Sequence, residues 1–568
     1  MSSERGCPFN LVDEPWIRVR DMRGISRELS LWDLFACAGE LKCLANDLPT
    51  QDIAILRLLL AILQRSLSPS LDEDDDPAEV WARLWEADTL PVEEIHSYLE
   101  KWRHRFDLLD KNEPFMQIAG LVRSNDAIKD EDGEPYLKRI IADVPSRRNR
   151  RLFSVRMGEG INRLSYAEAA RWLIHVHSFD TGGPKNAAKG DSSDVIKKEG
   201  RSYPGGTGWL GRIGCLYFEG STIKETLILN FVPLYRNEID SLFSENDLPI
   251  WERRQRCVSD GHEPRVLPDG RADLYTWQSR WVNFSHEDGM ITNVVLSAGD
   301  LLSVEAAELY TVENMTSWKE GTSKSKSSAP KLIPVHFDSD KALWRGLNAV
   351  FAQNCSNKDP ACHLSGTAVW LRHLSSNNGG RAISKEYLLN VHAVDFKYDD
   401  SQSSSYHSMV DDKLEMSSYL LSPEGAPLVN FACRCVEKTE EAVKTLGSLA
   451  VNLYLASGGD SESSLGVREA AKSRAFFEID RLFRVWFSAL GSQTNAEAAR
   501  AGWYAQLRDV LMRLAQELIG EAGPAAVRGS QLKNKKDWMT AGKAEARFYA
   551  TLDCILSCGS KEEKVKEG

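Results

Sequence analysis

Two histidines and an aspartate lie close enough in the sequence to suggest metal chemistry. His175, His177 and Asp180 fall within six residues, and imidazole and carboxylate groups are the ligands of many catalytic zinc ions. The surrounding apolar spacing predicts a helix, however, and residues two apart on a helix do not face each other. The pattern therefore favours histidines that pack within the protein. A metal-dependent hydrolase or nuclease that uses these three residues stays as an alternative function.

The chain also contains a glycine motif, Gly206-Thr-Gly-Trp-Leu-Gly211. A dinucleotide-binding loop needs a buried strand before such a motif and a helix after it. Here polar residues precede the motif and a strand-like run, residues 214–219, follows it. The motif is therefore interpreted as a loop that enters a strand.

The sequence offers no further catalytic pattern. It lacks the P-loop, GxSxG and HExxH patterns, and the carboxylate pair Asp411-Asp412 has no evident acid–base partner. The 11 cysteines are scattered without a CxxC pair, whereas structural zinc sites are typically built from such pairs. These observations predict a protein that is not an enzyme and that holds no cofactor and no metal.

The charge of the chain is uneven. The net charge is −12, which by itself argues against nucleic-acid binding. Residues 145–156 nevertheless carry five arginines and no acid, and residues 181–202 and 311–331 are each basic. Because only local charge has to meet a phosphate, the three basic loops are candidate nucleic-acid contacts on an acidic body.

Hydropathy predicts a cytoplasmic protein without a membrane segment. A membrane-spanning helix needs about 18 apolar residues, and the densest apolar run, residues 53–63, is interrupted by Arg57. The first residues lack the apolar stretch of a signal peptide.

The last quarter of the chain predicts a helical bundle. Apolar residues recur with helical spacing near residues 435–456, 465–490, 496–519 and 540–556. The third of these segments begins with Thr494-x-x-Glu497, the form of a capping box. Its apolar stripe consists of Trp503, Leu507, Val510, Leu514 and Leu518. Short connections between the four helices are typical of a four-helix bundle.

Residues 1–423 have a mixed pattern. The sequence predicts helices over residues 50–67, 92–102 and 165–178, and strands over residues 9–17, 214–219, 226–232 and 293–296. We therefore expect an α+β fold, with a large mixed N-terminal domain (residues 1–423) followed by a C-terminal four-helix bundle (residues 424–568).

The opening segment, Phe9-Asn-Leu-Val-Asp-Glu-Pro-Trp-Ile17, resembles the start of the CasA family, the large subunits of the type I-E CRISPR surveillance complex, Cascade. Three later segments are similar to the family in the same order: Pro114-Phe-Met-Gln117, Asp180-Thr-Gly-Gly-Pro-Lys185 with the glycine motif after it, and Ala342-Leu-Trp-Arg-Gly-Leu347. The resemblance implies a non-catalytic subunit that recognises the protospacer-adjacent motif (PAM) of double-stranded DNA. It also implies that the subunit starts duplex opening beside the guide RNA and helps to recruit the helicase-nuclease.

The resemblance implies a glycine loop that reads the PAM, formed here by Thr181, Gly182 and Gly183, with Lys185 just after it. Glycines allow a main chain to come close to a groove floor because they lack a Cβ atom. This chain departs from the family here, since it reads Gly-Pro-Lys-Asn-Ala where many members read Gly-x-Lys-Ser-Gly.

Two further PAM contacts are implied. The wedge glutamine of the family falls on Gln402, with Ser401 and Ser403 as second choices. An inserted polar tip would unstack a base step at a cost of a few kcal/mol. A third contact falls near Asn314 and Met315, with Lys319 as a substitute.

The arginine-rich loop corresponds to the family segment that reaches the 5′ handle of the guide RNA. Phe153 can stack on a base, or act instead as a buried staple. The residues that would meet phosphates are Arg147, Arg148, Arg150 and Arg151. The implied partners are the other Cascade subunits, the guide RNA, double-stranded target DNA and the helicase-nuclease. A purely structural scaffold is a further alternative.

Overall fold

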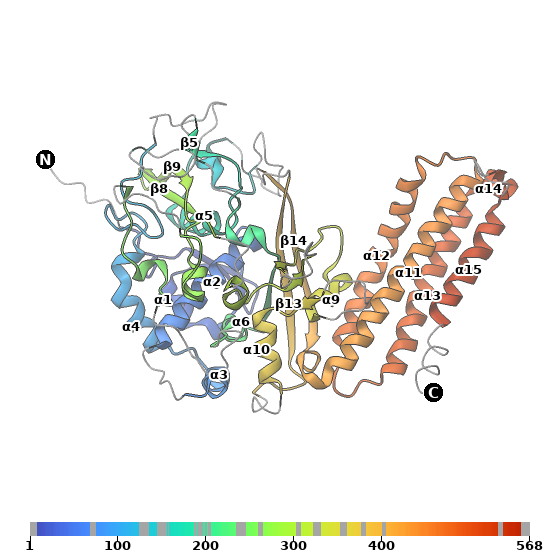
Figure 1. The fold of residues 1–568 in the computed structure, drawn as a ribbon, viewed down its shortest axis with the longest axis horizontal. Helices are drawn as coiled ribbons and strands as arrows, with labels where there is room; N and C mark the ends of the chain where they lie inside the picture. Colours follow the sequence, from blue (N-terminus) through green and yellow to red (C-terminus); the bar gives the residue numbers. More distant parts are fainter. Residues whose placement is uncertain are drawn as a thin grey trace. The chain divides into compact units, whose positions relative to one another are not determined.

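The computed structural model describes residues 8–557 apart from sixteen short segments. These segments are residues 69–74, 124–135, 145–155, 157, 187–188, 190–196, 199–200, 203–205, 234–245, 259–264, 303–307, 322–330, 353–360, 377–381, 400–404 and 532–537. The chain divides into two compact units (Figure 1). The first contains residues 1–343, 360–383 and 389–413, and the second contains residues 344–359, 384–388 and 414–568. The domain boundary between residues 423 and 424 stays a prediction.

The helices of the first unit surround one that is buried on almost every side. This helix, α2 (Pro49–Leu67), contacts α4, α5 and α7, and an apolar helix with no polar face belongs in a core. The other helices are α1 (Leu31–Ala36), α3 (Pro77–Glu86), α4 (Val92–Trp102), α5 (Tyr166–Phe179), α6 (Ile223–Asn230), α7 (Arg271–Tyr275), α8 (Glu308–Val312) and α10 (Gly366–Leu374). The helices predicted near α2, α4 and α5 are confirmed.

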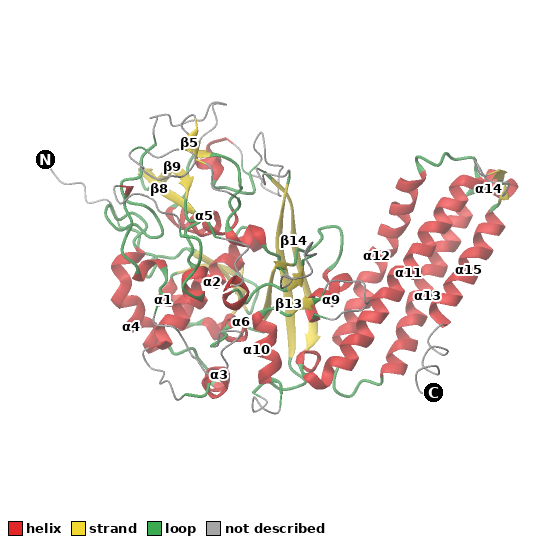
Figure 2. Ribbon diagram, in the orientation of Figure 1, coloured by secondary structure: helices red, strands yellow, loops and turns green. Residues whose placement is uncertain are grey.

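The sheets among the described residues are small and antiparallel, with two or three strands each (Figure 2). The first is β2 (Ser26–Leu29), β1 (Ile17–Asp21) and β3 (Leu41–Leu44). A small sheet has the order β4 (Lys185–Asn186), β6 (Arg201–Ser202) and β5 (Lys197–Lys198), and another is β11 (Leu332–Pro334), β10 (Trp318–Glu320) and β12 (Cys362–His363). The hairpin of β8 (Arg280–Glu287) and β9 (Met290–Ala298) forms a two-stranded sheet. The long strands β13 (Leu388–Tyr398) and β14 (Tyr406–Ser417) form a hairpin, and β13 also pairs with β7 (Cys215–Glu219).

Two predicted strands are wrong. Residues 226–232 lie mostly in the helix α6, whose start is capped by Thr222, because the Thr222 side chain accepts a hydrogen bond from the main-chain N–H of Glu225. The Thr222-x-x-Glu225 spacing is a helix-start signal, and it outweighs the β-propensity of the apolar residues that follow. Residues 9–17 form turns, and β1 begins only at Ile17.

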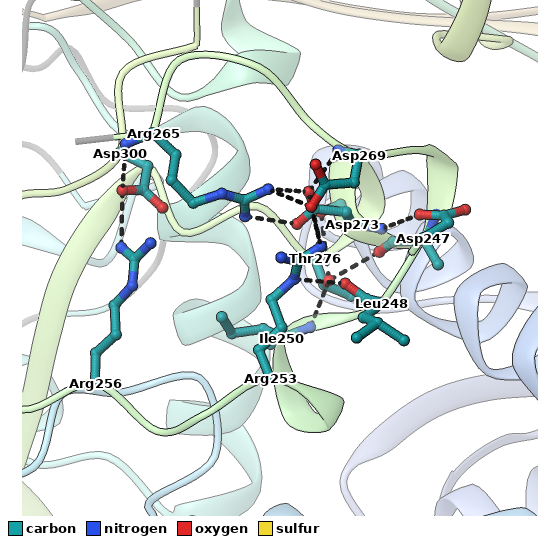
Figure 3. Close-up of polar contacts among 11 residues, drawn as sticks. Asp247, Leu248, Ile250, Arg253, Arg256, Arg265, Asp269, Asp273, Thr276 and Asp300 are labelled. Atoms are coloured by element: carbon teal, nitrogen blue, oxygen red, sulfur yellow. Dashed lines mark hydrogen bonds and ion pairs between the residues drawn. The ribbon is translucent and has the colours of Figure 1, made fainter. Parts of the chain in front are cut away.

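A network of arginines and aspartates braces the segment before β8 (Figure 3). The Arg265 and Arg253 guanidinium groups both contact the buried Asp273 carboxylate, and Arg253 lies 2.8 Å from Asp269. After β9, Asp300 accepts hydrogen bonds from the Arg265 main chain and the Arg256 side chain. The network therefore fixes both ends of the β8–β9 hairpin, whose first residue, Arg280, belongs to the site below.

The second unit contains the predicted bundle, which is confirmed. Its helices are α11 (Ala426–Ala456), α12 (Ser464–Ser488), α13 (Ala496–Glu521) and α15 (Ala541–Ser557), and α11 packs against the other three (Figure 1). The unit also contains α9 (Leu347–Phe351), α14 (Gly523–Arg528) and the strands β15 (Ser530–Gln531) and β16 (Trp538–Met539). The described helices thus combine with the antiparallel sheets into an α+β fold, as predicted.

The start and the apolar face of α13 differ from the prediction. The cap is Asn495, whose side chain accepts a hydrogen bond from Ala498 N–H, whereas the Thr494 hydroxyl binds Gly491 N–H. The buried face is Trp503, Leu507, Leu511, Leu514 and Ala515. Val510 and Leu518 are half-buried, so the buried face is offset from the predicted stripe at these two positions.

The bundle core contains an aromatic cluster on α12 and α13 that gives a sharp stability test. Phe483 is fully buried and lies within 4.3–5.9 Å, ring centre to ring centre, of Trp344, Trp486, Phe487 and Trp503. We expect Phe483→Ala to lower the free energy of unfolding of this unit by about 3–5 kcal/mol, because it removes a buried ring and leaves a cavity. Denaturant unfolding followed by tryptophan fluorescence measures the change.

Phe477 provides the matched control on the same helix, because its side chain is 83% exposed. Phe477→Ala should change the unfolding free energy by no more than about 0.5 kcal/mol. Equal losses in the two variants would contradict this description of the core.

Candidate nucleic-acid interface

The glycine loop begins where α5 ends. Ser165 caps the start of α5 by accepting a hydrogen bond from Glu168 N–H, and Asp180 lies at its C-terminal cap. The loop then runs to β4, which starts at Lys185. Gly182 is partly exposed, whereas Thr181 and Gly183 are buried. Gly182 and Pro184 are thus the parts of this loop that reach the surface.

Lys185 lies inside the protein and does not extend from the loop. Its ammonium nitrogen is 2.8 Å from the Asp180 carboxylate and donates a hydrogen bond of 3.0 Å to the Thr181 hydroxyl. Burial lowers the pKa of Lys185 to about 8, and the charge of Asp180 opposes that shift. Burial alone would raise the pKa of Asp180, but the charges of Lys185 and Arg280 outweigh it and lower the pKa. The pair is therefore ionised at neutral pH and braces the base of the loop.

Arg280 shares the Asp180 carboxylate and also binds main-chain atoms. Its guanidinium donates hydrogen bonds to the carbonyl oxygens of Thr181 at 2.9 Å and Gly206 at 2.8 Å, and its Nε atom contacts Asp180. One buried side chain thereby connects the glycine loop to the glycine motif.

The glycine motif packs against the end of α5. Gly208 N–H donates to the Asp180 carbonyl oxygen at 2.9 Å, and a Cβ atom at Gly208 would lie 2.5 Å from the main chain of Ser178. After a short 3-10 helix, Trp209–Arg212, the chain enters β7. The prediction of a loop that enters a strand is confirmed, and the first role of Gly208 is close packing.

The β13–β14 hairpin contacts the end of α5, beside the glycine loop. Tyr398, the last residue of β13, donates a hydrogen bond of 2.6 Å from its hydroxyl to the Phe179 carbonyl oxygen, and the hydroxyl of Tyr406, the first residue of β14, lies 3.3 Å from that oxygen. The base of this hairpin and the base of the glycine loop are therefore in direct contact. Gln402, Ser401 and Ser403 fall between Tyr398 and Tyr406 in the sequence and lie outside the described residues.

The two histidines have separate structural partners. His175 Nε2 lies 3.0 Å from the Thr50 hydroxyl, and His177 Nε2 lies 2.9 Å from the Met116 carbonyl oxygen. Burial lowers the pKa of His175 to about 3 and that of His177 to about 4, so both are neutral. Within the described part of the chain, no three His, Cys, Asp or Glu side chains are grouped to hold a metal ion. This geometry gives the hydrolase alternative no support.

The remaining predicted contacts are buried, half-buried or outside the described residues. Asn314 and Met315 are buried in the core, where the Met315 carbonyl oxygen accepts a hydrogen bond from Leu216 N–H. Lys319 lies on β10 and is half-buried. The arginine-rich loop, Arg147, Arg148, Arg150, Arg151 and Phe153, lies outside the described residues.

Arg280, Tyr398 and Tyr406 were not identified from the sequence. Arg280 begins the mostly apolar run Arg-Trp-Val-Asn-Phe of β8, and an arginine in such a strand indicates a buried cation with a partner. The two tyrosines flank a polar hairpin tip, but their shared partner, Phe179, is more than 200 residues away.

Comparison with known proteins places this fold in one family. The CRISPR-associated protein CasA/Cse1 of Thermus thermophilus is 30% identical over 346 residues, so the aligned region spans 60% of this chain and 60% of the relative. The crystal structure of Thermobifida fusca Cse1 matches with a TM-score of 0.83 and 32% identity, over 97% of this chain and 98% of that chain.

A chain of a structure described as a CRISPR RNA-guided surveillance complex has the same fold, with a TM-score of 0.64 and 18% identity over 96% of this chain and 100% of that chain. None of the described helices is both long and apolar enough to cross a membrane. The model of the family described as CRISPR-associated protein Cse1 matches residues 10–514. With most of its length matched in this way, the chain belongs to the CRISPR-associated Cse1 family.

Proposed function

We propose that this chain is the non-catalytic large subunit of a type I-E CRISPR surveillance complex in the cytoplasm. In this role it recognises the PAM of double-stranded DNA, starts duplex opening for guide RNA pairing and helps to recruit the helicase-nuclease. Family membership supports the role in the complex, and the similar chain from a CRISPR RNA-guided surveillance complex agrees with it.

The observation that carries the DNA-binding part is the junction at Phe179. The glycine loop and the hairpin are more than 200 residues apart in the sequence, yet Tyr398 joins their bases through one hydrogen bond. Two segments that contact neighbouring base pairs need bases that lie close together, and the bases of these two segments are in contact. Two loops that serve only as connections would not need such a contact.

The burial of several side chains limits which atoms are proposed to contact DNA. The proposal assigns groove contact to the main chain of Thr181, Gly182 and Gly183, with Gly182 at the surface, because glycine permits close main-chain approach. Lys185 supports this loop from beneath through its ion pair with Asp180. The proposal leaves out Asn314 and Met315, since both are buried.

Gln402 is the proposed wedge, with Ser401 and Ser403 beside it at the hairpin tip. A polar side chain pushed into a base step separates the stacked bases and offers its amide to the exposed edges. The arginine-rich loop, with Phe153 as a stacking residue, is proposed to dock the subunit on the guide RNA.

The test is duplex opening by the assembled complex carrying Gln402→Ala. We expect the variant to open a PAM-bearing duplex about tenfold more slowly, as seen by a fluorescent base analogue beside the PAM, because the wedge no longer offsets unstacking. A target with a pre-opened bubble at those positions should restore the wild-type rate.

The matched control is Gln506→Ala, which removes an exposed glutamine from α13. It should open the duplex at the wild-type rate. A Gln402→Ala complex that opens the duplex as fast as wild type would contradict the wedge assignment. If deleting residues 181–202 also left PAM-bearing DNA binding intact, the scaffold alternative would be correct.

A further inference from the structure

The two proposed DNA-reading segments rest on one buried polar cluster. We define the loop-base cluster as the Phe179 carbonyl group together with Asp180, Arg280, Tyr398 and Tyr406. All four side chains are buried or nearly so. They come from the end of α5, the start of β8, and the last and first residues of the paired strands β13 and β14.

Arg280 uses its whole guanidinium within the protein. Its Nε atom contacts the Asp180 carboxylate, Nη1 donates to the Ser279 carbonyl oxygen at 2.7 Å, and Nη2 donates to the Thr181 and Gly206 carbonyl oxygens. All three nitrogens therefore point at protein atoms, and the side chain is 1% exposed. A cation held in this way acts on main-chain position and does not serve as a phosphate contact.

Tyr398 lies where β13 ends and anchors that end of the hairpin. The next residue, Asp399, donates a main-chain hydrogen bond of 2.9 Å to the Ser405 carbonyl oxygen. The Tyr398 hydroxyl then attaches this end of the hairpin to Phe179, one residue before the glycine loop begins. Movement of one segment relative to the other must stretch or break this hydrogen bond.

The glycine motif makes room for that contact. A Cβ atom at Gly211 would lie 2.3 Å from the Tyr398 hydroxyl oxygen and 2.9 Å from its ring carbon Cζ. Any larger residue at position 211 would push Tyr398 away from Phe179. The last glycine of the motif is thereby explained by the hairpin contact, and its role has no connection with a phosphate.

We propose that Arg280 and Tyr398 are positioning residues that fix the glycine loop relative to the paired ends of β13 and β14, so that PAM reading by the glycine loop depends on the loop-base cluster. This inference rests on the proposed function. It adds residues that touch neither DNA nor RNA but set the geometry of the glycine loop, and PAM discrimination then depends on buried atoms at the base of that loop.

Tyr398→Phe is the most conservative test, because it removes only one hydroxyl. The measured quantity is the ratio of affinities of the assembled complex for a PAM-bearing duplex and for the same duplex with an altered PAM. We expect the variant to lower this ratio about three- to tenfold, the effect of one buried hydrogen bond. Affinity for a target that is pre-opened beside the PAM should stay at the wild-type value.

Tyr98→Phe is the matched control, since the Tyr98 hydroxyl is also buried and donates to Glu252 at 2.6 Å, away from the loop-base cluster. It should leave the ratio unchanged even where it lowers the melting temperature as much as Tyr398→Phe. Arg280→Lys, which keeps the charge but loses the planar donor fork, should lower the ratio further. If that variant does not fold, Tyr398→Phe decides the question.

The outcomes separate the two proposals. If the wild-type complex prefers the PAM-bearing duplex and the Tyr398→Phe complex has the same preference, the positioning role is wrong and the proposed function still stands. Equal falls in the ratio for Tyr398→Phe and Tyr98→Phe would also overturn it, because the effect would then come from stability. A wild-type ratio of one contradicts the proposed function, and the inference falls with it.

Discussion

Replacing Glu313 with alanine is expected to lower the free energy of unfolding of the first unit by about 3–5 kcal/mol, the usual cost of leaving one partner of a buried ion pair alone. Glu313 is fully buried and forms two hydrogen bonds of 2.8 and 2.9 Å with the Arg57 guanidinium in the middle of α2. It also accepts hydrogen bonds from Trp209 Nε1 and Met315 N–H. Four groups from three segments would lose their acceptor in this variant.

Burial lowers the pKa of Arg57, but with Glu313 present the Glu313 charge outweighs burial and holds the pKa above its ordinary value. In the variant that support is lost, but an arginine guanidinium is not deprotonated in proteins. Without Glu313, the protein core must therefore contain an uncompensated cation or admit water. Denaturant unfolding followed by tryptophan fluorescence measures the loss.

The matched control is Glu469→Ala, which breaks an exposed ion pair of 2.8 Å with Lys472 on α12. Exposed pairs contribute about 0–1 kcal/mol, so this variant should unfold almost as wild type does. The double variant Arg57→Met with Glu313→Leu should recover part of the loss, because it removes both charges. A Glu313→Ala protein no less stable than the Glu469→Ala protein would contradict the buried-pair argument.

Replacing the four arginines of the docking loop together is expected to weaken association of the subunit with the guide RNA complex by about two orders of magnitude at physiological salt. Each phosphate contact to single-stranded RNA contributes about 0.7 to the slope of log affinity against log salt. If all four arginines meet phosphates, the slope should fall by about 3. The replaced residues are Arg147, Arg148, Arg150 and Arg151.

The matching variant with four lysines at these positions separates charge from shape. It should keep most of the salt dependence, since the charges remain. Phe153→Ala should lower affinity without changing the slope, because stacking releases no counterions. An unchanged slope in the four-alanine variant would contradict guide docking by this loop.

Local sequence signals were sufficient for elements that depend on local contacts or on a regular repeat of apolar residues. The helices α2, α4 and α5 lie within a residue of their predicted bounds, because their apolar residues repeat with helical spacing. The strand predicted at α6 was wrong, since a Thr222 cap and burial of the apolar residues overrode their β-propensity. The cap of α13 was misplaced by one residue because Thr494 and Asn495 both have suitable side chains.

The contacts of the loop-base cluster could not be predicted from a single sequence. The glycine loop was identified from the family resemblance, but Arg280 lies 100 residues from Asp180 and Tyr398 lies 219 residues from Phe179. No spacing rule connects positions so far apart. The resemblance placed Lys185 beside the PAM-reading loop, whereas in the structure its ammonium group is buried against the Asp180 carboxylate.

The central claim is that this chain gives the complex its preference for the PAM. The most direct measurement is equilibrium binding of the complex, assembled with and without this chain, to a library of duplexes that share one protospacer and differ in the PAM, across a salt series. We expect a preference for a subset of PAM sequences that requires this chain and persists as salt rises, since phosphate contacts are common to all the duplexes. Equal affinity for every PAM, or the same preference without this chain, would contradict the claim.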